Sequence, residues 1–126
     1  QGNLVRNLFR REHEKEDKRG VGIGVEADAA VSGNTIENAP TAGIQIGWGP
    51  FMRDVAATGN VIRRSRVGIA VTSAPEAGSC LIANNLISES IDGAIRAMNH
   101  GAVLGPDLAR EPQAAGRIAV SGNVAT

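Results

Sequence analysis

Six residues lie within or shortly after a recurring Gly-Ile-x-Val motif, and their types suit the recognition of a sugar. An aromatic ring stacks on the apolar face of a sugar, while arginine and aspartate bind its hydroxyl or carboxylate groups. The alternative is that Trp48 and Phe51 fold back over the protein and that Arg53 pairs with Asp54 or Glu26. The candidate ligand-binding residues are Trp48, Phe51, Arg53, Asp54, Arg96 and His100.

The same segments give less support for catalysis. Glycoside hydrolysis requires two carboxylates on opposite sides of the scissile bond, one of them with a raised pKa. Glu26, Asp28 and Asp54 have no spacing that singles them out, and Arg96 with His100 is the best remaining pair. One position of the Gly-Ile-x-Val strand is expected to face outward in every repeat, and it contains no carboxylate. The residues at this position are Gly24, Gln45, Ala70 and Arg96.

Residues 9–19, FRREHEKEDKR, form a run of mixed charge in which His13 lies among four acidic residues. Histidine and carboxylates together can bind a metal ion. The acids alternate with Lys15, Lys18 and Arg19, however, and the run offers a single imidazole, so a solvated loop is expected. The sequence predicts no metal site and no cofactor.

The single cysteine, Cys80, rules out an internal disulfide. It aligns with Ala29, Val55 and Ile118 in an apolar column of the repeat described below. A buried structural thiol is therefore expected rather than a reactive one.

An asparagine recurs in a fixed context along the chain and defines a repeat. The two central intervals are 26 and 25 residues, and the outer ones are 31 and 38. An aliphatic or alanine residue precedes most of these asparagines by three places, and Val or Ile follows four of them by two. Gly-Ile-x-Val or a related motif comes later in each repeat, as GIGV, GIQI, GIAV and GAIRA. The anchors are Asn3, Asn34, Asn60, Asn85 and Asn123.

Both motifs alternate with period two over three to five residues, which predicts short strands rather than helices. A repeat of about 25 residues with several short strands is typical of a parallel β-solenoid. We expect an all-β, right-handed parallel β-helix of about four to five coils. Its predicted core comprises Ile23, Val25, Val31, Ile36, Ile44, Ile46, Ile62, Ile69, Val71, Ile82, Ile87, Ile95 and Val120.

The Gly-Asn or Asn-Asn pair fits a sharp corner of such a coil. Glycine adopts left-handed backbone conformation freely, and asparagine tolerates it best among the other residues. Asparagines at the same corner of successive coils also hydrogen-bond to one another, so a ladder through Asn34, Asn60, Asn85 and Asn123 is predicted.

The basic run RRSR at 63–66 is expected to be neutralised by neighbouring coils. The repeat places Arg63 beside Glu37 and Arg64 beside Glu89. Thirteen basic and thirteen acidic residues also cancel over the whole chain. We therefore expect no nucleic-acid partner, and the absence of a long apolar run predicts no membrane insertion.

The repeat resembles the coil of pectin-lyase-like right-handed parallel β-helices. More narrowly, SGNTIENAPTAGIQIGWG, with NVIRRSRVGIAV and DGAIRAMNHG, is similar to a family of twin-arginine-translocated repeat proteins of unknown function. The narrower resemblance implies an exported bacterial protein longer than this chain, in the periplasm or outside the cell. It implies no reaction, and the polygalacturonase motifs Asn-Thr-Asp, Asp-Asp and Arg-Ile-Lys are absent.

Residues 1–126 are expected to form one β-helix domain with a charged loop insertion at 9–19 and a long loop insertion at 98–116. Neither end of the sequence resembles a cap, which predicts end-to-end packing with more solenoid or with other chains. The expected function is that of a non-catalytic scaffold or carbohydrate-binding surface, with a polysaccharide as partner. The alternative is a polysaccharide lyase or glycoside hydrolase with its site on the loops after the Gly-Ile-x-Val strands.

Overall fold

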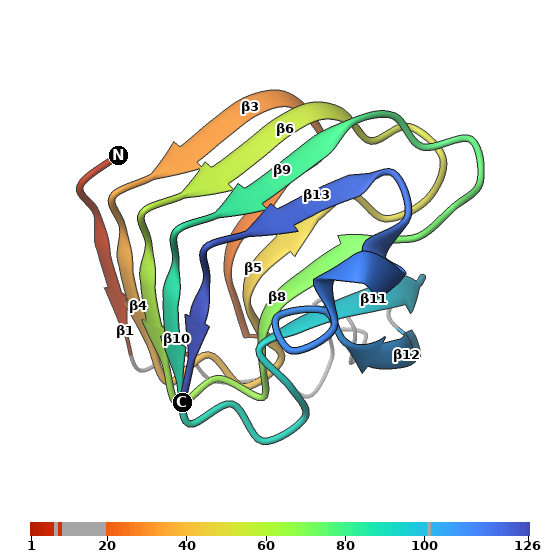
Figure 1. Ribbon diagram of the computed structural model, residues 1–126. Helices are drawn as coiled ribbons and strands as arrows, with labels where there is room; N and C mark the ends of the chain where they lie inside the picture. The colour runs from red at the N-terminus through yellow and green to blue at the C-terminus, as the bar shows by residue number, and fades with distance from the viewer. Residues whose placement is uncertain (7, 9–19, 101) are drawn as a thin grey trace.

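The computed structural model describes residues 1–6, 8, 20–100 and 102–126, and over these ranges the protein is all-β (Figure 1). Fourteen strands among the described residues form three sheets, in which every strand pair but one is parallel. The only helical segment in the same ranges is the short 3-10 helix η2 (Pro112–Ala115). The prediction of an all-β chain with parallel sheets is confirmed.

Each sheet collects one strand from each repeat. Sheet B consists, in spatial order, of β2 (Val21–Val25), β5 (Ala42–Ile46), β8 (Val67–Thr72), β11 (Ile95–Asn99) and β12 (Ala102–Asp107). Sheet C consists of β3 (Ala27–Ser32), β6 (Arg53–Thr58), β9 (Cys80–Ala83) and β13 (Ile118–Ser121). Sheet A consists of β1 (Leu4–Arg6), β4 (Thr35–Glu37), β7 (Val61–Arg63), β10 (Leu86–Ser88) and β14 (Val124–Ala125).

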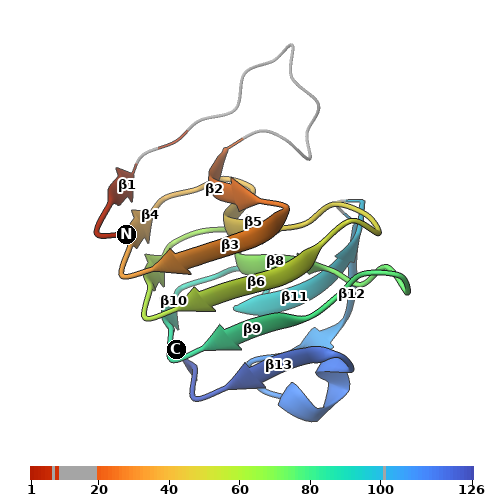
Figure 2. The same ribbon diagram turned by 90° about the horizontal axis from the view of Figure 1, so that it is seen from above.

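The chain visits the sheets in a fixed order, from B to C to A, and then returns to sheet B one strand further along. Figure 2 shows the strands of sheet C side by side in this succession. The expected register is also found, since Ile36 pairs with Ile62 and Ile95 pairs with Ile69. This path is compatible with the coiled architecture that the repeat predicts.

The core lies between the three sheets and is built from aliphatic side chains. Ten of the thirteen predicted core residues are buried, and Ile23, Val25 and Val120 are half-buried against them. The chain contains two Phe, one Trp and no Tyr, and most of its largest fully buried side chains are isoleucines.

The first glycine of each Gly-Ile-x-Val motif allows sheets A and B to approach closely. A Cβ atom at Gly43 would lie 2.6 Å from Ile62 Cγ2 and 2.7 Å from the Gly68 carbonyl oxygen. Gly22 and Gly68 have equivalent surroundings in their own coils. The glycine is therefore required by packing, whereas Gly24 on the outer face has nothing within 4 Å of its Cβ position.

The two residues of each Gly-Asn pair have different tasks. The first turns the corner in left-handed conformation, with φ of 66° at Gly33 and 67° at Gly59. Asn84 takes the same conformation with φ of 57°, so an Asn-Asn pair replaces Gly-Asn in one repeat. The second residue has ordinary φ and directs its side chain into the protein.

Those second residues form a continuous hydrogen-bonded ladder. Asn34 Nδ2 donates to Asn60 Oδ1 at 3.1 Å, and Asn60 Nδ2 donates to Asn85 Oδ1 at 2.9 Å. The ladder extends from Asn3 to Asn123. Each Oδ1 from Asn34 onward also accepts the backbone N–H of the preceding asparagine, so these buried amides satisfy one another.

The basic run is neutralised by two carboxylates, Glu37 and Asp92, and Arg66 Nε donates to Asp92 Oδ2 at 2.6 Å. Arg63 Nε lies 3.5 Å from Glu37 Oε1, and Arg64 Nη2 lies 3.6 Å from Glu37 Oε2. Arg64 Nε also donates to Asn38 Oδ1 at 3.3 Å. The predicted partner Glu89 is therefore wrong, because Arg64 turns toward the preceding coil instead of the following one.

The long loop insertion predicted at 98–116 is partly regular structure. β12 pairs antiparallel with β11, and Leu108 is buried against the core of the last coil. The Asp107 carboxylate accepts the backbone N–H groups of Ala94, Ile95 and Ala109 at 2.8 to 3.0 Å. Residues 102–107 therefore pair with the edge of β11 and become the last strand of sheet B, where the sequence predicted no cap.

The structure contains no helix of the length and apolarity needed to cross a membrane, as far as residues 1–6, 8, 20–100 and 102–126 are concerned. The charged loop insertion predicted at 9–19, including His13, lies outside the described residues.

Candidate functional site

Loops of unequal length follow the strands of sheet B and project from the same side of the molecule (Figure 1). We call residues 47–52, 73–79 and 99–100 the loop edge. Loops that leave a repeated scaffold on one side are common sites of binding, because they vary without disturbing the stack. The loop edge is therefore the part of the molecule most suited to binding a ligand.

Trp48 and His100 contact each other across two coils. Their ring centroids are 5.6 Å apart and the ring planes meet at 70°, an edge-to-face arrangement. Thr72 Oγ1 donates to the Gly49 carbonyl at 3.1 Å, which fixes the turn that carries Trp48. His100 Nδ1 lies 2.8 Å from Asn99 Oδ1, and His100 itself has φ of 49°.

A hollow of about 350 Å³ opens beside this ring pair and is called here the His100 hollow. It combines apolar side chains with hydroxyl, amide, imidazole and carboxylate groups, a mixture that suits a polar ligand with apolar faces. Its lining residues are Pro50, Ser73, Ala74, Pro75, Glu76, Asn99, His100 and Leu104.

Arg53 and Asp54 lie in β6 and not in a loop, which corrects their predicted position. Arg53 pairs with Asp28 on the neighbouring strand, with Nη2 at 2.9 Å from Oδ2 and Nε at 3.3 Å from Oδ1. The expected partners Asp54 and Glu26 are thus wrong. The hydrogen bond from Arg53 lowers the pKa of Asp28, and Asp28 in turn raises the pKa of Arg53.

Arg96 is engaged inside its own coil. Its Nη1 donates to the Asp92 carbonyl at 2.6 Å, and its Nη2 donates to the Gly105 carbonyl at 2.7 Å. A Cβ atom at Gly93 would lie 2.6 Å from Arg96 Cδ, so the glycine makes room for this folded side chain. Arg96 anchors the segment around β12, and the structure gives no contact between it and His100.

Phe51 and Asp54 point to different surroundings. Phe51 is 76% exposed at the tip of the loop edge, so it does not fold back over the protein. Asp54 lines a shallow hollow on the outer face of sheet C together with Asp28 and Arg117. Of the six predicted residues, the structure brings Trp48 and His100 into contact, places Phe51 on the same edge, and directs Arg53, Asp54 and Arg96 elsewhere.

Sequence reasoning missed the residues from the third coil. Ser73 and Glu76 belong to the segment TSAPEAGS, which contains no aromatic ring or arginine, so its residue types do not single it out. Asn99 was likewise missed, because its role depends on its contact with His100. Segments 47–52 and 73–79 follow aligned strands of successive repeats, and this correspondence could have predicted that they lie side by side.

Cys80 is buried among apolar residues, as the sequence predicts. Burial raises the pKa of its thiol to about 11, because the surrounding side chains solvate a thiolate poorly. A thiol of that pKa is almost entirely protonated near neutral pH, which makes it a poor nucleophile or metal ligand.

Within the described residues, no cluster of three or more His, Cys, Asp or Glu side chains is arranged to hold a metal ion. Comparisons with family models, with curated proteins and with solved structures found no match to this chain.

Proposed function

We propose that the chain is a right-handed parallel β-helix domain of the pectin-lyase-like type that binds a carbohydrate at its loop edge without transforming it. The observation that carries the proposal is the Trp48–His100 ring pair beside the His100 hollow. Export to the periplasm or beyond is part of the proposal and rests on the resemblance to twin-arginine-translocated repeat proteins.

Three features support the β-helix. The chain cycles through the same three sheets, the strands of successive repeats pair in parallel, and the asparagine ladder runs through five coils. A stack of this kind offers neighbouring loops at intervals of about 4.8 Å, close enough for several coils to contact one oligosaccharide.

The chemistry of the loop edge favours a sugar. Phe51 is exposed and Trp48 is held half-buried, so both rings are placed where an apolar sugar face could stack. The Glu76 and Asn99 side chains supply the hydrogen-bonding groups that hydroxyls require.

The electrostatics favour binding over hydrolysis. Asp28 and Asp54 occupy corresponding positions on adjacent strands and line the same hollow, which is the observation that keeps a hydrolase as the second candidate. A hydrolase of this type requires one carboxyl with a raised pKa, whereas Arg53 lowers the pKa of Asp28. Arg96, the other catalytic candidate, is committed to backbone carbonyls.

The test is a titration of the protein against neutral and acidic oligosaccharides, with product analysis for reducing ends and unsaturated sugars. We expect saturable binding, no turnover, and at least tenfold weaker binding in Trp48→Ala. Leu86→Ala is the matched control, because Leu86 is an exposed apolar residue on sheet A, away from the loop edge. Turnover that is lost in Asp54→Asn would favour the hydrolase, and unchanged binding in Trp48→Ala would overturn the proposed site.

A further inference from the structure

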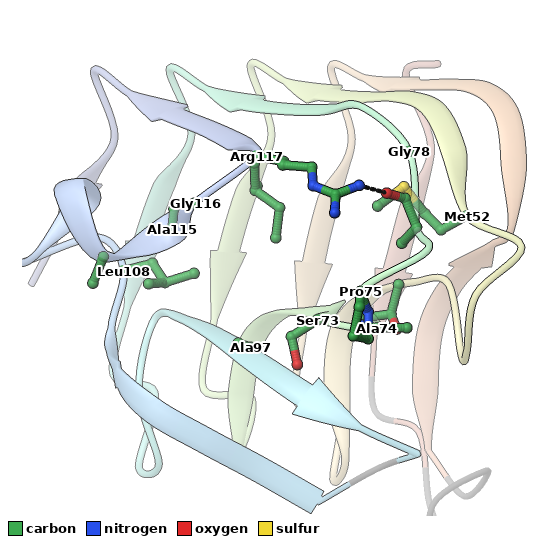
Figure 3. Close-up of a pocket in the computed structure, with 14 residues that line it drawn as sticks. Met52, Ser73, Ala74, Pro75, Gly78, Ala97, Leu108, Ala115, Gly116 and Arg117 are labelled. Carbon is green, nitrogen blue, oxygen red and sulfur yellow. Dashed lines mark hydrogen bonds between the residues drawn. The ribbon is translucent and has the colours of Figure 1, made fainter.

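A second hollow, here called the Arg117 cavity, lies between residues 72–78 and residues 114–118 and has a volume of about 250 Å³ (Figure 3). It occupies the corner between sheets B and C where the loops of the last two coils separate. The loop at 73–75 forms one wall of this cavity and also lines the His100 hollow. The two sites therefore adjoin but have different linings.

The inner walls of the Arg117 cavity are apolar. Met52 and Leu108 are buried there, and Ala97, Ala115 and Ile118 complete the surface. The two hydroxyl groups at the cavity are already hydrogen-bonded, Thr72 to the Gly49 carbonyl and Ser73 to the Met98 carbonyl. The interior thus favours a hydrocarbon group over a hydroxylated one.

Arg117 is the one charged residue among the described residues that line this cavity. Arg117 Nη1 donates to the Ala77 carbonyl at 3.2 Å, as the dashed line in Figure 3 marks. A guanidinium carries five N–H donors, so this single bond leaves others for an anion. None of the described residues that line the cavity is acidic, and no carboxylate of the described chain lies within ion-pair distance of Arg117.

We propose that the Arg117 cavity binds a small anionic amphiphile, a short-chain carboxylate whose tail enters the cavity and whose head group meets Arg117. The available volume sets the size, since about 30 Å³ per water-sized group allows roughly eight heavy atoms, as in hexanoate. This site is separate from carbohydrate binding, so either proposal can fail without the other.

The test is a titration of the 126-residue chain with hexanoate, followed by methyl NMR of labelled methionine and alanine. Methyl chemical-shift changes that saturate with hexanoate are expected at Met52 and Ala115. Hexylamine has the same six-carbon chain but the opposite charge, and it is expected to give no saturable change. Arg117→Ala is expected to weaken binding about tenfold, since it removes a charge-assisted hydrogen bond. Arg117→Lys keeps the charge and is expected to stay within about threefold of the unchanged protein.

Two further variants separate binding from folding. Ala115→Leu fills the cavity and is expected to abolish the shifts at Met52, while circular dichroism reports a retained fold. Arg110→Ala removes another arginine of the same segment that does not line the cavity, and is expected to leave binding unchanged. Equal binding of hexylamine, or unchanged binding in Arg117→Ala or Ala115→Leu, would overturn the proposal.

Discussion

The three stacked sheets and the loop edge follow opposite rules. In the stack, the same residue types recur at the same position, as the asparagine ladder and the inward isoleucines show. At the loop edge, each coil contributes something different, with Trp48 from one coil, Glu76 from the next and His100 from the last. Residue types that recur at equivalent positions of the repeat therefore have structural roles. A ligand would be recognised where the residue types differ between repeats.

The largest expected effect breaks the stack at its centre. Asn60→Ala removes the acceptor for two N–H groups of Asn34 and leaves them buried, so the free energy of unfolding should fall by about 3 kcal/mol. Asn3→Ala is the control, because Asn3 is exposed and lies at the end of the ladder. Urea unfolding measures both, and an equal loss in the two variants would contradict a cooperative role for the buried ladder.

The second effect tests the close approach of sheets A and B. Gly43→Ala forces a methyl group against Ile62 and the Gly68 carbonyl, which should lower the free energy of unfolding by about 2 kcal/mol. Gly24→Ala changes the same motif on the open outer face and should cost less than about 0.5 kcal/mol. If thermal and urea unfolding rank the two variants the other way, the packing argument for the glycine column is wrong.

The third effect concerns the buried thiol. The pKa of Cys80 is raised to about 11, so the unfolded chain loses this proton first as the pH rises. Stability should therefore fall from about pH 9 to pH 11, by on the order of 2 kcal/mol more than in Cys80→Ala. Urea unfolding at several pH values measures this difference, and parallel pH profiles for the two proteins would show that Cys80 is not desolvated.

The smallest effect belongs to the exposed pair on sheet C. Arg53 lowers the pKa of Asp28, so the ion pair stabilises the folded state above the ordinary pKa of an aspartate. This stabilisation is lost as the pH falls through the lowered pKa. Arg53→Met should return the pKa of Asp28 toward its usual value, with no measurable change in the unfolding midpoint at pH 7. A carboxyl NMR titration checks this, and an unchanged pKa in the variant would refute the pairing.

The sequence was sufficient to predict the strands, their register and the ladder, because each depends on residue type at a repeated position. It was not sufficient for the second corner of the coil, where Asn38, Arg64 and Glu89 all take left-handed conformation. Arginine and glutamate have no local preference for that conformation, so hydrogen bonds to neighbouring coils impose it. At this corner Arg64 pairs with Glu37 and not with Glu89.

The candidate site was harder to predict than the fold for the same reason. Trp48 and His100 are 52 positions apart, and no repeated pattern relates one to the other. The Arg53–Asp28 pair was missed because both residues were expected in loops, whereas they lie in strands β6 and β3. Contacts between unlike coils depend on loop paths, which residue types alone do not determine.

The most direct test of this division is a chemical-shift map of the protein during titration with a panel of neutral and acidic oligosaccharides. The account predicts that amide shifts with a bound sugar concentrate at Trp48, at residues 73–76 and at His100, while the ladder asparagines and sheet A stay unchanged. Shifts centred on the outer face of sheet A, or no shifts with any sugar in the panel, would contradict the assignment of binding to the loop edge.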